Sequence, residues 1–209
     1  GLTYLKKGLQ INLSIPDNDY WIASCYNNIA AVYTIHLNNN DSAIYFLKKV
    51  VPLMMHLYSA DHPEVSNAYQ HLAYAYQSIN TDSALLYYRK SLLISSNKDS
   101  VGLTLEKSMK RALINHSAAY AYGVVYQSEV LWAQYKHTKD LKYIQSALHN
   151  FNMLHQITIE KLLMVDWESS RANYLRELRL FYHQYLQLLY EVYIQEKKEL
   201  YATTALDVM

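Results

Sequence analysis

The sequence is poor in the residues that interrupt helices or cross-link chains. Its 209 residues include one cysteine, three prolines and four glycines. The single Cys25 excludes an intramolecular disulfide and, with no secretory signal in the sequence, favours a reducing, cytoplasmic location. After Pro63, only Gly102 and Gly123 are expected by composition to interrupt a helix. These shortages predict an all-α protein.

Net charge and long apolar runs are also scarce, which excludes two classes of partner. The formal net charge is +1, so no strong field attracts nucleic acid or anionic lipid. Although 51% of the residues are hydrophobic, they are distributed periodically. No run approaches the roughly 18 apolar residues that a membrane span requires. We therefore expect neither nucleic-acid nor membrane binding.

What the sequence does contain is a helical pattern that returns after about 42 residues. Small residues recur where two helices would cross, because they let the backbones approach, and large residues recur beside them. The pattern in the best-defined unit is Tyr69, Leu72, Ala73 and Tyr76, followed by Ala84, Tyr88 and Ser91. The equivalent positions upstream are Tyr26, Ile29, Ala30 and Tyr33, followed by Ala43, Leu47 and Val50, and before these Gly1, Leu5 and Gly8.

This pattern resembles the tetratricopeptide (TPR) repeat, a pair of packed helices. The opening at 62–65, His-Pro-Glu-Val with Ser66 in place of alanine, is similar to the kinesin-light-chain type of repeat. The resemblance implies a right-handed α-solenoid of antiparallel helix pairs. The chain starts at a second helix and stops within a helix, so it looks like an excised segment. We expect apolar surface at both ends, at Leu5, Leu9, Leu206 and Met209.

Three local features predict where helices begin, bend or end. Asp17 or Asp19 is expected to cap the helix that spans about 20–36. Pro52 lies within the next predicted helix, where it predicts a kink or an early end. The long helical segment after residue 102 is expected to break near 115–117 or at Gly123.

The most polar stretch, 95–102, is the predicted boundary between two regions. Residues 1–97 form the TPR repeats, the first of them incomplete. Residues 98–209 form a less regular, TPR-like region of longer helices whose last repeat is truncated. This region resembles the segment upstream of the caspase-like domain in bacterial TPR–CHAT proteins. The resemblance is carried by residues 135–144, 168–171, 190–191 and 205–206. It implies the regulatory arm of a larger protein with a C-terminal caspase-like domain.

No arrangement of residue types predicts catalysis. The nine histidines are scattered and none has metal-ligand spacing. Cys25 and His71 both lie on first helices of repeats, but we interpret Cys25 as a small packing residue. The 22 tyrosines fit packing positions better than a base-stacking platform. We therefore predict a protein that is not an enzyme, with no catalytic residue, metal or cofactor.

One set of residues is a candidate binding site. In a TPR array the first helices line the concave surface, and the residues beside the packing positions face the groove. These residues are uncharged and rich in amides, which suits the backbone of a protein or peptide ligand. They are Asn27, Ala31, Thr34, Asn67, Gln70, Tyr74 and Gln77. The alternative is a structural spacer or self-association scaffold, because solvent-facing helix positions are polar in any case.

Overall fold

The computed structural model describes residues 1–95, 118–164, 172, 176, 179–197 and 199–208 of the chain. All regular secondary structure in these residues is helical, which confirms the all-α prediction. The chain divides into two compact units, Gly1–Leu105 and Glu106–Met209. The predicted boundary between residues 97 and 98 lies outside the described residues.

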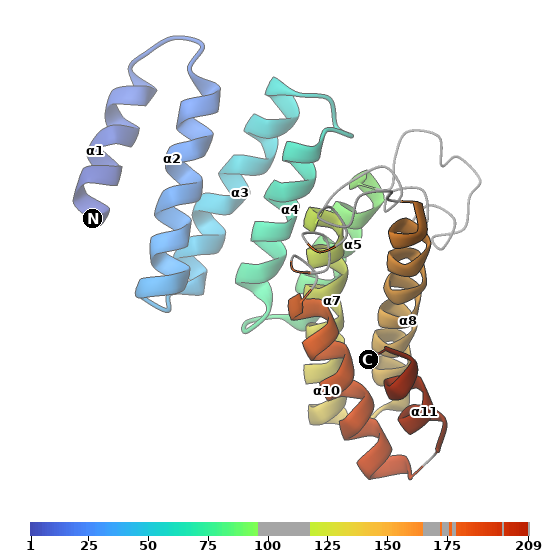
Figure 1. Cartoon of the computed structure of the whole chain (residues 1–209). Coiled ribbons are helices and arrows are strands. Elements are labelled where there is room, and N and C mark those ends of the chain that lie inside the picture. Colours follow the sequence, from blue (N-terminus) through green and yellow to red (C-terminus); the bar gives the residue numbers. More distant parts are fainter. Residues whose placement is uncertain (96–117, 165–171, 173–175, 177–178, 198, 209) are drawn as a thin grey trace. The chain divides into compact units, whose positions relative to one another are not determined.

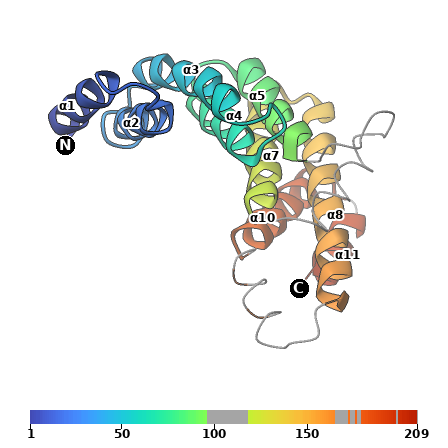
Figure 2. The same cartoon turned by 90° about the horizontal axis from the view of Figure 1, so that it is seen from above.

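The described part of the first unit is a row of helices joined by short turns. In chain order the elements are α1 (Leu2–Leu13), α2 (Asp19–Ala31), the π-helical turn η1 (Val32–His36), α3 (Asn40–Leu57), α4 (Pro63–Tyr76) and α5 (Thr81–Ser95). Neighbouring helices run antiparallel and lie side by side in both views (Figure 1 and Figure 2). The predicted helix pairs are therefore present, while the handedness of the row stays a prediction.

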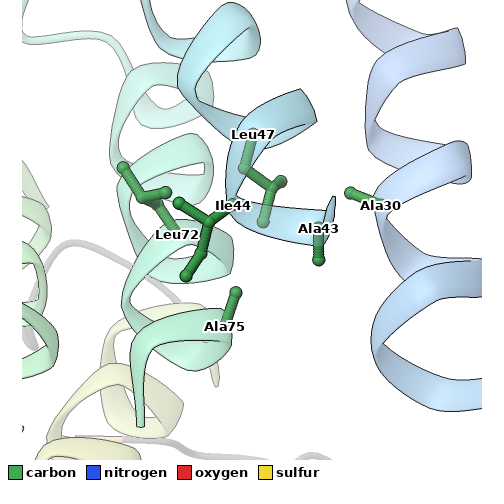
Figure 3. Close-up of a cluster of buried hydrophobic side chains, with 6 residues drawn as sticks. All are labelled: Ala30, Ala43, Ile44, Leu47, Leu72 and Ala75. Carbon is green, nitrogen blue, oxygen red and sulfur yellow. The ribbon is translucent and has the colours of Figure 1, made fainter. Parts of the chain in front are cut away.

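Small residues lie where the helices of this unit cross. Ala30 in α2 and Ala73 in α4 are almost completely buried, as their position in the repeat predicts. Figure 3 shows one such cluster, in which residues of α2 and α4 pack on both sides of α3. Its members are Ala30, Ala43, Ile44, Leu47, Leu72 and Ala75. The burial of both alanines confirms the repeat register.

In each of the second helices α3 and α5, an aromatic side chain packs against two tyrosines of the preceding first helix. Phe46 in α3 stacks on Tyr33 of η1 with 5.8 Å between ring centroids, and lies 5.9 Å from Tyr26 of α2. We call this arrangement an aromatic wedge, because the phenylalanine ring contacts tyrosines separated by seven positions of one helix. Aromatic pairs at such distances stabilise beyond the area that they bury.

The next repeat contains the same wedge. Tyr87 in α5 follows Phe46 by 41 residues and stacks on Tyr69 and Tyr76 of α4, at 6.0 and 5.5 Å between centroids. Lysines of the second helices lie over the same tyrosines, 5.5 to 5.8 Å from the ring centroids. The pairs are Lys6 with Tyr33, Lys48 with Tyr76, Lys49 with Tyr26, and Lys90 with Tyr69. Wedge and lysine together are a repeating element of this unit.

The predicted cap of the second helix is wrong. Asn18 occupies the N-cap position of α2, and its side chain makes no capping hydrogen bond. Asp19 is the first helical residue, and its Oδ2 lies 2.8 Å from Nδ1 of His56 on α3. Asp17 adopts a left-handed backbone conformation with φ of 53°. The carboxylate of Asp19 therefore links α2 to α3 instead of capping α2.

Two predicted interruptions do not end their helices. α3 continues past Pro52 to Leu57, because Pro52 is exposed and water can bond the carbonyl group that it leaves unpaired. α7 (Ala118–Thr138) runs unbroken through Gly123, since one glycine costs a helix only about 1 kcal/mol. The alternative break at 115–117 lies outside the described residues.

The leucines near the start of the chain are less exposed than the sequence predicts. Leu9 is buried and Leu5 partly buried, because both pack against Ile29 and its neighbours on α2. The expectation of exposure is therefore wrong for Leu9. The side chain of Leu206 and all of Met209 lie outside the described residues.

The second unit packs its described helices around buried aromatic rings. These helices are α7, α8 (Leu141–Met164), α10 (Arg179–Glu196) and α11 (Glu199–Val208). Phe151, Phe181 and Tyr185 are buried, with centroids 5.3 to 5.9 Å apart. Burial raises the pKa of Tyr185 to about 12, so its hydroxyl stays protonated and donates to Asn152. Tyrosine packing, predicted from sequence, is confirmed at this site.

Candidate peptide-binding surface

The predicted binding residues of the second complete repeat follow one face of α4. Asn67, Gln70 and Tyr74 lie within α4, and Gln77 is its C-cap residue. Their spacing of three and four positions places them on a common helix face. Tyr74 is 48% exposed, while the three amide residues are partly buried. This face therefore combines accessible polar atoms with one exposed ring.

The equivalent residues of the preceding repeat lie on α2 and η1. Asn27 is partly buried in α2, Ala31 is exposed at its last residue, and Thr34 is partly buried in η1. They too follow a spacing of four and three positions. We call the seven positions of the two stripes the amide surface.

Thr34 and Gln77 of the amide surface use polar atoms inside the protein. The Thr34 hydroxyl donates to the Ala30 carbonyl oxygen at 3.1 Å. Nε2 of Gln77 donates to the Tyr88 hydroxyl oxygen at 3.0 Å. Gln77 thereby links the end of α4 to the buried ring of Tyr88 on α5. Each residue has fewer groups left for a ligand than the sequence suggests.

Asn27, in contrast, has a polar atom without a hydrogen-bond partner in the described part of the chain. Its Oδ1 is buried and accepts no hydrogen bond within the described part of the chain. A buried acceptor without a donor costs about 1–3 kcal/mol relative to a satisfied one. The oxygen is buried in the described structure, so a ligand can bond to it only after the side chain turns.

Electrostatically, the amide surface is neutral. None of its seven members carries a formal charge. Amide side chains both donate and accept, so they can pair with both polar groups of a peptide unit. The arrangement can therefore bind a backbone through hydrogen bonds, with Tyr74 available as an apolar contact.

The structure also places Cys25 and His71, the two residues that were considered for other chemistry. Cys25 is partly buried in α2, and Nδ2 of Asn12 approaches its Sγ at 3.5 Å, whereas His71 is exposed on α4. Among the residues that the structure describes, no group of three or more histidines, cysteines or acids could hold a metal ion. No described helix is both long and apolar enough to cross a bilayer.

The aromatic wedges and their lysines are the surface elements that sequence reasoning missed. The repeat spacing could have indicated them, because Phe46 and Tyr87 are separated by 41 residues, as are Lys49 and Lys90. The tyrosines were assigned to packing as a class. Which ring enters which pair depends on the crossing of the helices, and that became visible only in three dimensions.

Comparison with known families agrees with the repeat pattern. The tetratricopeptide repeat family matches residues 21–95, from the first turn of α2 to the end of α5. Residues 21–95 form tetratricopeptide repeats. No curated protein matches the chain. TPR repeats generally mediate protein–protein interactions, and the amide surface lies on the first helices of the matched TPR segment.

Proposed function

We propose that this chain is a non-catalytic TPR interaction module that binds a protein or peptide segment across the amide surface. The observation that carries the proposal is the TPR match over 21–95. Within that segment, six of the seven residues of the amide surface are polar and none is charged. The module acts in the cytoplasm, without a metal or cofactor.

The ligand is held mainly through its backbone. Asn67 and Gln70 carry their amide groups on one face of α4, and Asn27 carries a buried carbonyl oxygen that accepts no hydrogen bond in the described structure. Tyr74, 48% exposed, supplies an apolar contact. Because no charged pair is involved, affinity depends little on ionic strength.

The test is a binding measurement with the doubly substituted variant Asn67→Ala/Gln70→Ala. The partner is first identified by its co-purification with the wild-type chain, and its affinity is then measured by calorimetry at low and high salt. Each lost amide contact should cost about 1–3 kcal/mol, because the ligand group is left unpaired. Wild-type affinity should change little with salt.

The matched control is Asn28→Ala, which removes an exposed asparagine of α2 outside the amide surface. It should bind like wild type, and circular dichroism should show all variants equally helical. Equal affinity of the double variant and wild type would remove the amide surface from the binding site.

A structural spacer is the second candidate function. The internal hydrogen bonds of Thr34 and Gln77 favour it, because they tie part of the amide surface to the fold itself. A spacer predicts that no partner is lost from Asn67→Ala/Gln70→Ala in a pull-down. The two functions are thus separated by the same variant.

We also propose that the module is the regulatory arm of a larger bacterial protein with a caspase-like domain, and that residues 98–209 continue it as an irregular TPR-like region. The support is the resemblance to TPR–CHAT proteins at 135–144 and 190–191. In the structure Glu191 accepts from Nε1 of Trp132 at 2.9 Å, joining α10 to α7. The test is the coding sequence downstream of Met209, where a paired histidine and cysteine in a caspase-like domain is expected.

A further inference from the structure

Positive and negative charges occupy different places in the first unit. All lysines and arginines of positions 1–95 lie on the second helices α1, α3 and α5, one adjacent pair on each helix. They are Lys6, Lys7, Lys48, Lys49, Arg89 and Lys90. The aspartates and glutamates of these positions, equal in number, lie in turns or in the first turn of a helix. The second helices are therefore basic beyond their first turn, although positions 1–95 carry no net formal charge.

The first aromatic wedge has a lysine at each of its two ends. Lys6 lies over the ring of Tyr33, 5.8 Å from the centroid, and Lys49 lies over that of Tyr26 at 5.6 Å. Both tyrosines contact the ring of Phe46 between them. Because seven helical positions rise by about 10 Å, the wedge presents two well-separated cations.

The second wedge has the same arrangement. Lys48 lies over Tyr76 at 5.8 Å, and Lys90 lies over Tyr69 at 5.5 Å. Both tyrosines contact Tyr87. Lys48 is also the neighbour in sequence of the lysine on the first wedge, so the two wedges meet at α3. We call the four cations of the two wedges the lysine face: Lys6, Lys48, Lys49 and Lys90.

The charge of the lysine face is not neutralised within the described part of the chain. Three of its lysines are exposed and Lys49 is partly buried, and none forms an ion pair with a described carboxylate. The hydroxyl of Tyr76 raises the pKa of Lys48, and that of Tyr45 raises the pKa of Lys49, so both stay protonated. A ring beside each ammonium group restricts it but cannot satisfy its three N–H donors. The face is therefore an ordered set of cations in need of acceptors.

We propose that the lysine face binds an acidic segment of a partner protein, whose carboxylates pair with the ammonium groups while its chain crosses the wedges. Carboxylates supply the charged acceptors that the lysines lack. A protein partner is favoured because TPR repeats generally mediate protein–protein interactions. The lysine face goes beyond the amide surface, since its binding groups are charged and lie on the second helices.

The sequence argues against two other occupants of the lysine face. No two acidic residues are adjacent anywhere in the chain, so a second copy offers no acidic run. A long polyanion such as nucleic acid would also meet the acidic helix starts of the unit, and positions 1–95 carry no net charge to attract it. A short acidic segment meets the lysines alone.

The test uses a synthetic peptide of alternating glutamate and glycine, labelled at its end with a fluorophore. Its binding to the whole chain is measured by fluorescence anisotropy. We expect wild type to bind at about 20 mM salt, and at least about tenfold more weakly at about 500 mM, because salt screens exposed charges. A peptide with glutamine in place of every glutamate should not bind.

The variant Lys48→Gln/Lys49→Gln removes one lysine from each wedge. It should bind the glutamate peptide at least about threefold more weakly than wild type at low salt, since two ion pairs are lost. Lys48→Arg/Lys49→Arg keeps both charges and should bind like wild type. Circular dichroism should show both variants as helical as wild type, because glutamine and arginine are good helix formers.

The matched control is Lys136→Gln/Lys139→Gln on the second unit. It removes the same charge from two exposed lysines that also lie over rings, Trp132 at 4.5 Å and Tyr135 at 5.6 Å. It should bind the peptide like wild type. No binding to wild type overturns the proposal, and so does equal weakening in the two glutamine variants, which would reflect net charge alone. Tighter binding of a single-stranded oligonucleotide than of the peptide would make nucleic acid the occupant and overturn it as well.

Discussion

Replacing Phe46 with alanine tests whether the aromatic wedge holds the TPR helices together. Phe46 joins α3 to Tyr26 of α2 and Tyr33 of η1, at centroid distances of 5.9 and 5.8 Å. It also packs against the buried cluster around Ala30 and Ile44. The substitution removes the ring from both environments and leaves a void between two helices.

The magnitude follows from burial and ring contacts. Truncation of a fully buried phenylalanine costs about 3–5 kcal/mol. Phe46 is only partly buried, which lowers this contribution, while its two ring contacts on α2 each add about 0.5–1.5 kcal/mol. We expect a loss of about 2–4 kcal/mol in the free energy of unfolding. Phe46→Tyr should be nearly neutral, because Tyr87 fills the same position in the next repeat.

Urea unfolding followed by circular dichroism measures the loss, and hydrogen exchange locates it. Amide protection should fall first in α2 and α3 of the variant, since these helices lose the contact. The outcome that refutes the reasoning is a Phe46→Ala protein within about 0.5 kcal/mol of wild type, the range of an ordinary surface substitution. A loss in Phe46→Tyr as large as in Phe46→Ala would also contradict it.

Two further substitutions test the packing register of the repeats and the effect of the partly buried Glu129 on stability. Ala73→Leu should lower stability by roughly 1–3 kcal/mol through overpacking, whereas Ala31→Leu, at an exposed position, should be nearly neutral. Equal melting temperatures for the two would contradict the register. Burial raises the pKa of Glu129, partly offset by a hydrogen bond from Gln184, so the folded protein should lose stability as pH rises from about 4.5 through the raised pKa. Glu129→Gln should remove this loss and should be more stable than wild type at neutral pH. Unfolding curves of both proteins across that pH range measure the effect. The same pH dependence of stability in both proteins would contradict the reasoning.

The sequence predicted helix pairs more securely than helix ends. Ala30 and Ala73 are buried as the repeat requires, because a crossing point tolerates only a small side chain whatever surrounds it. The cap of α2 was predicted wrongly, and α3 does not end early at Pro52, while a kink there stays a prediction. Both depend on what lies nearby in space: His56 draws Asp19 away from a capping role, and solvent compensates the carbonyl group that Pro52 leaves unpaired.

For the residues proposed to bind a ligand, the sequence predicted the position on the helix but not the internal hydrogen bonds. Their spacing placed Asn67, Gln70 and Tyr74 on one face of α4, since helical periodicity needs no tertiary information. The engagement of Gln77 by Tyr88 could not be predicted, because those residues belong to different helices whose approach sets the hydrogen bond.

By itself, the sequence determined that this protein is all-α, that its repeat recurs about every 42 residues, and which small residues lie at helix crossings. These properties follow from local periodicity and side-chain volume. Only the tertiary structure decided that Phe46 packs between Tyr26 and Tyr33, and that Tyr87 packs between Tyr69 and Tyr76. The physical reason is that ring contacts and exposure depend on which helix covers which face, and the same aromatic residue is buried or exposed according to its neighbour.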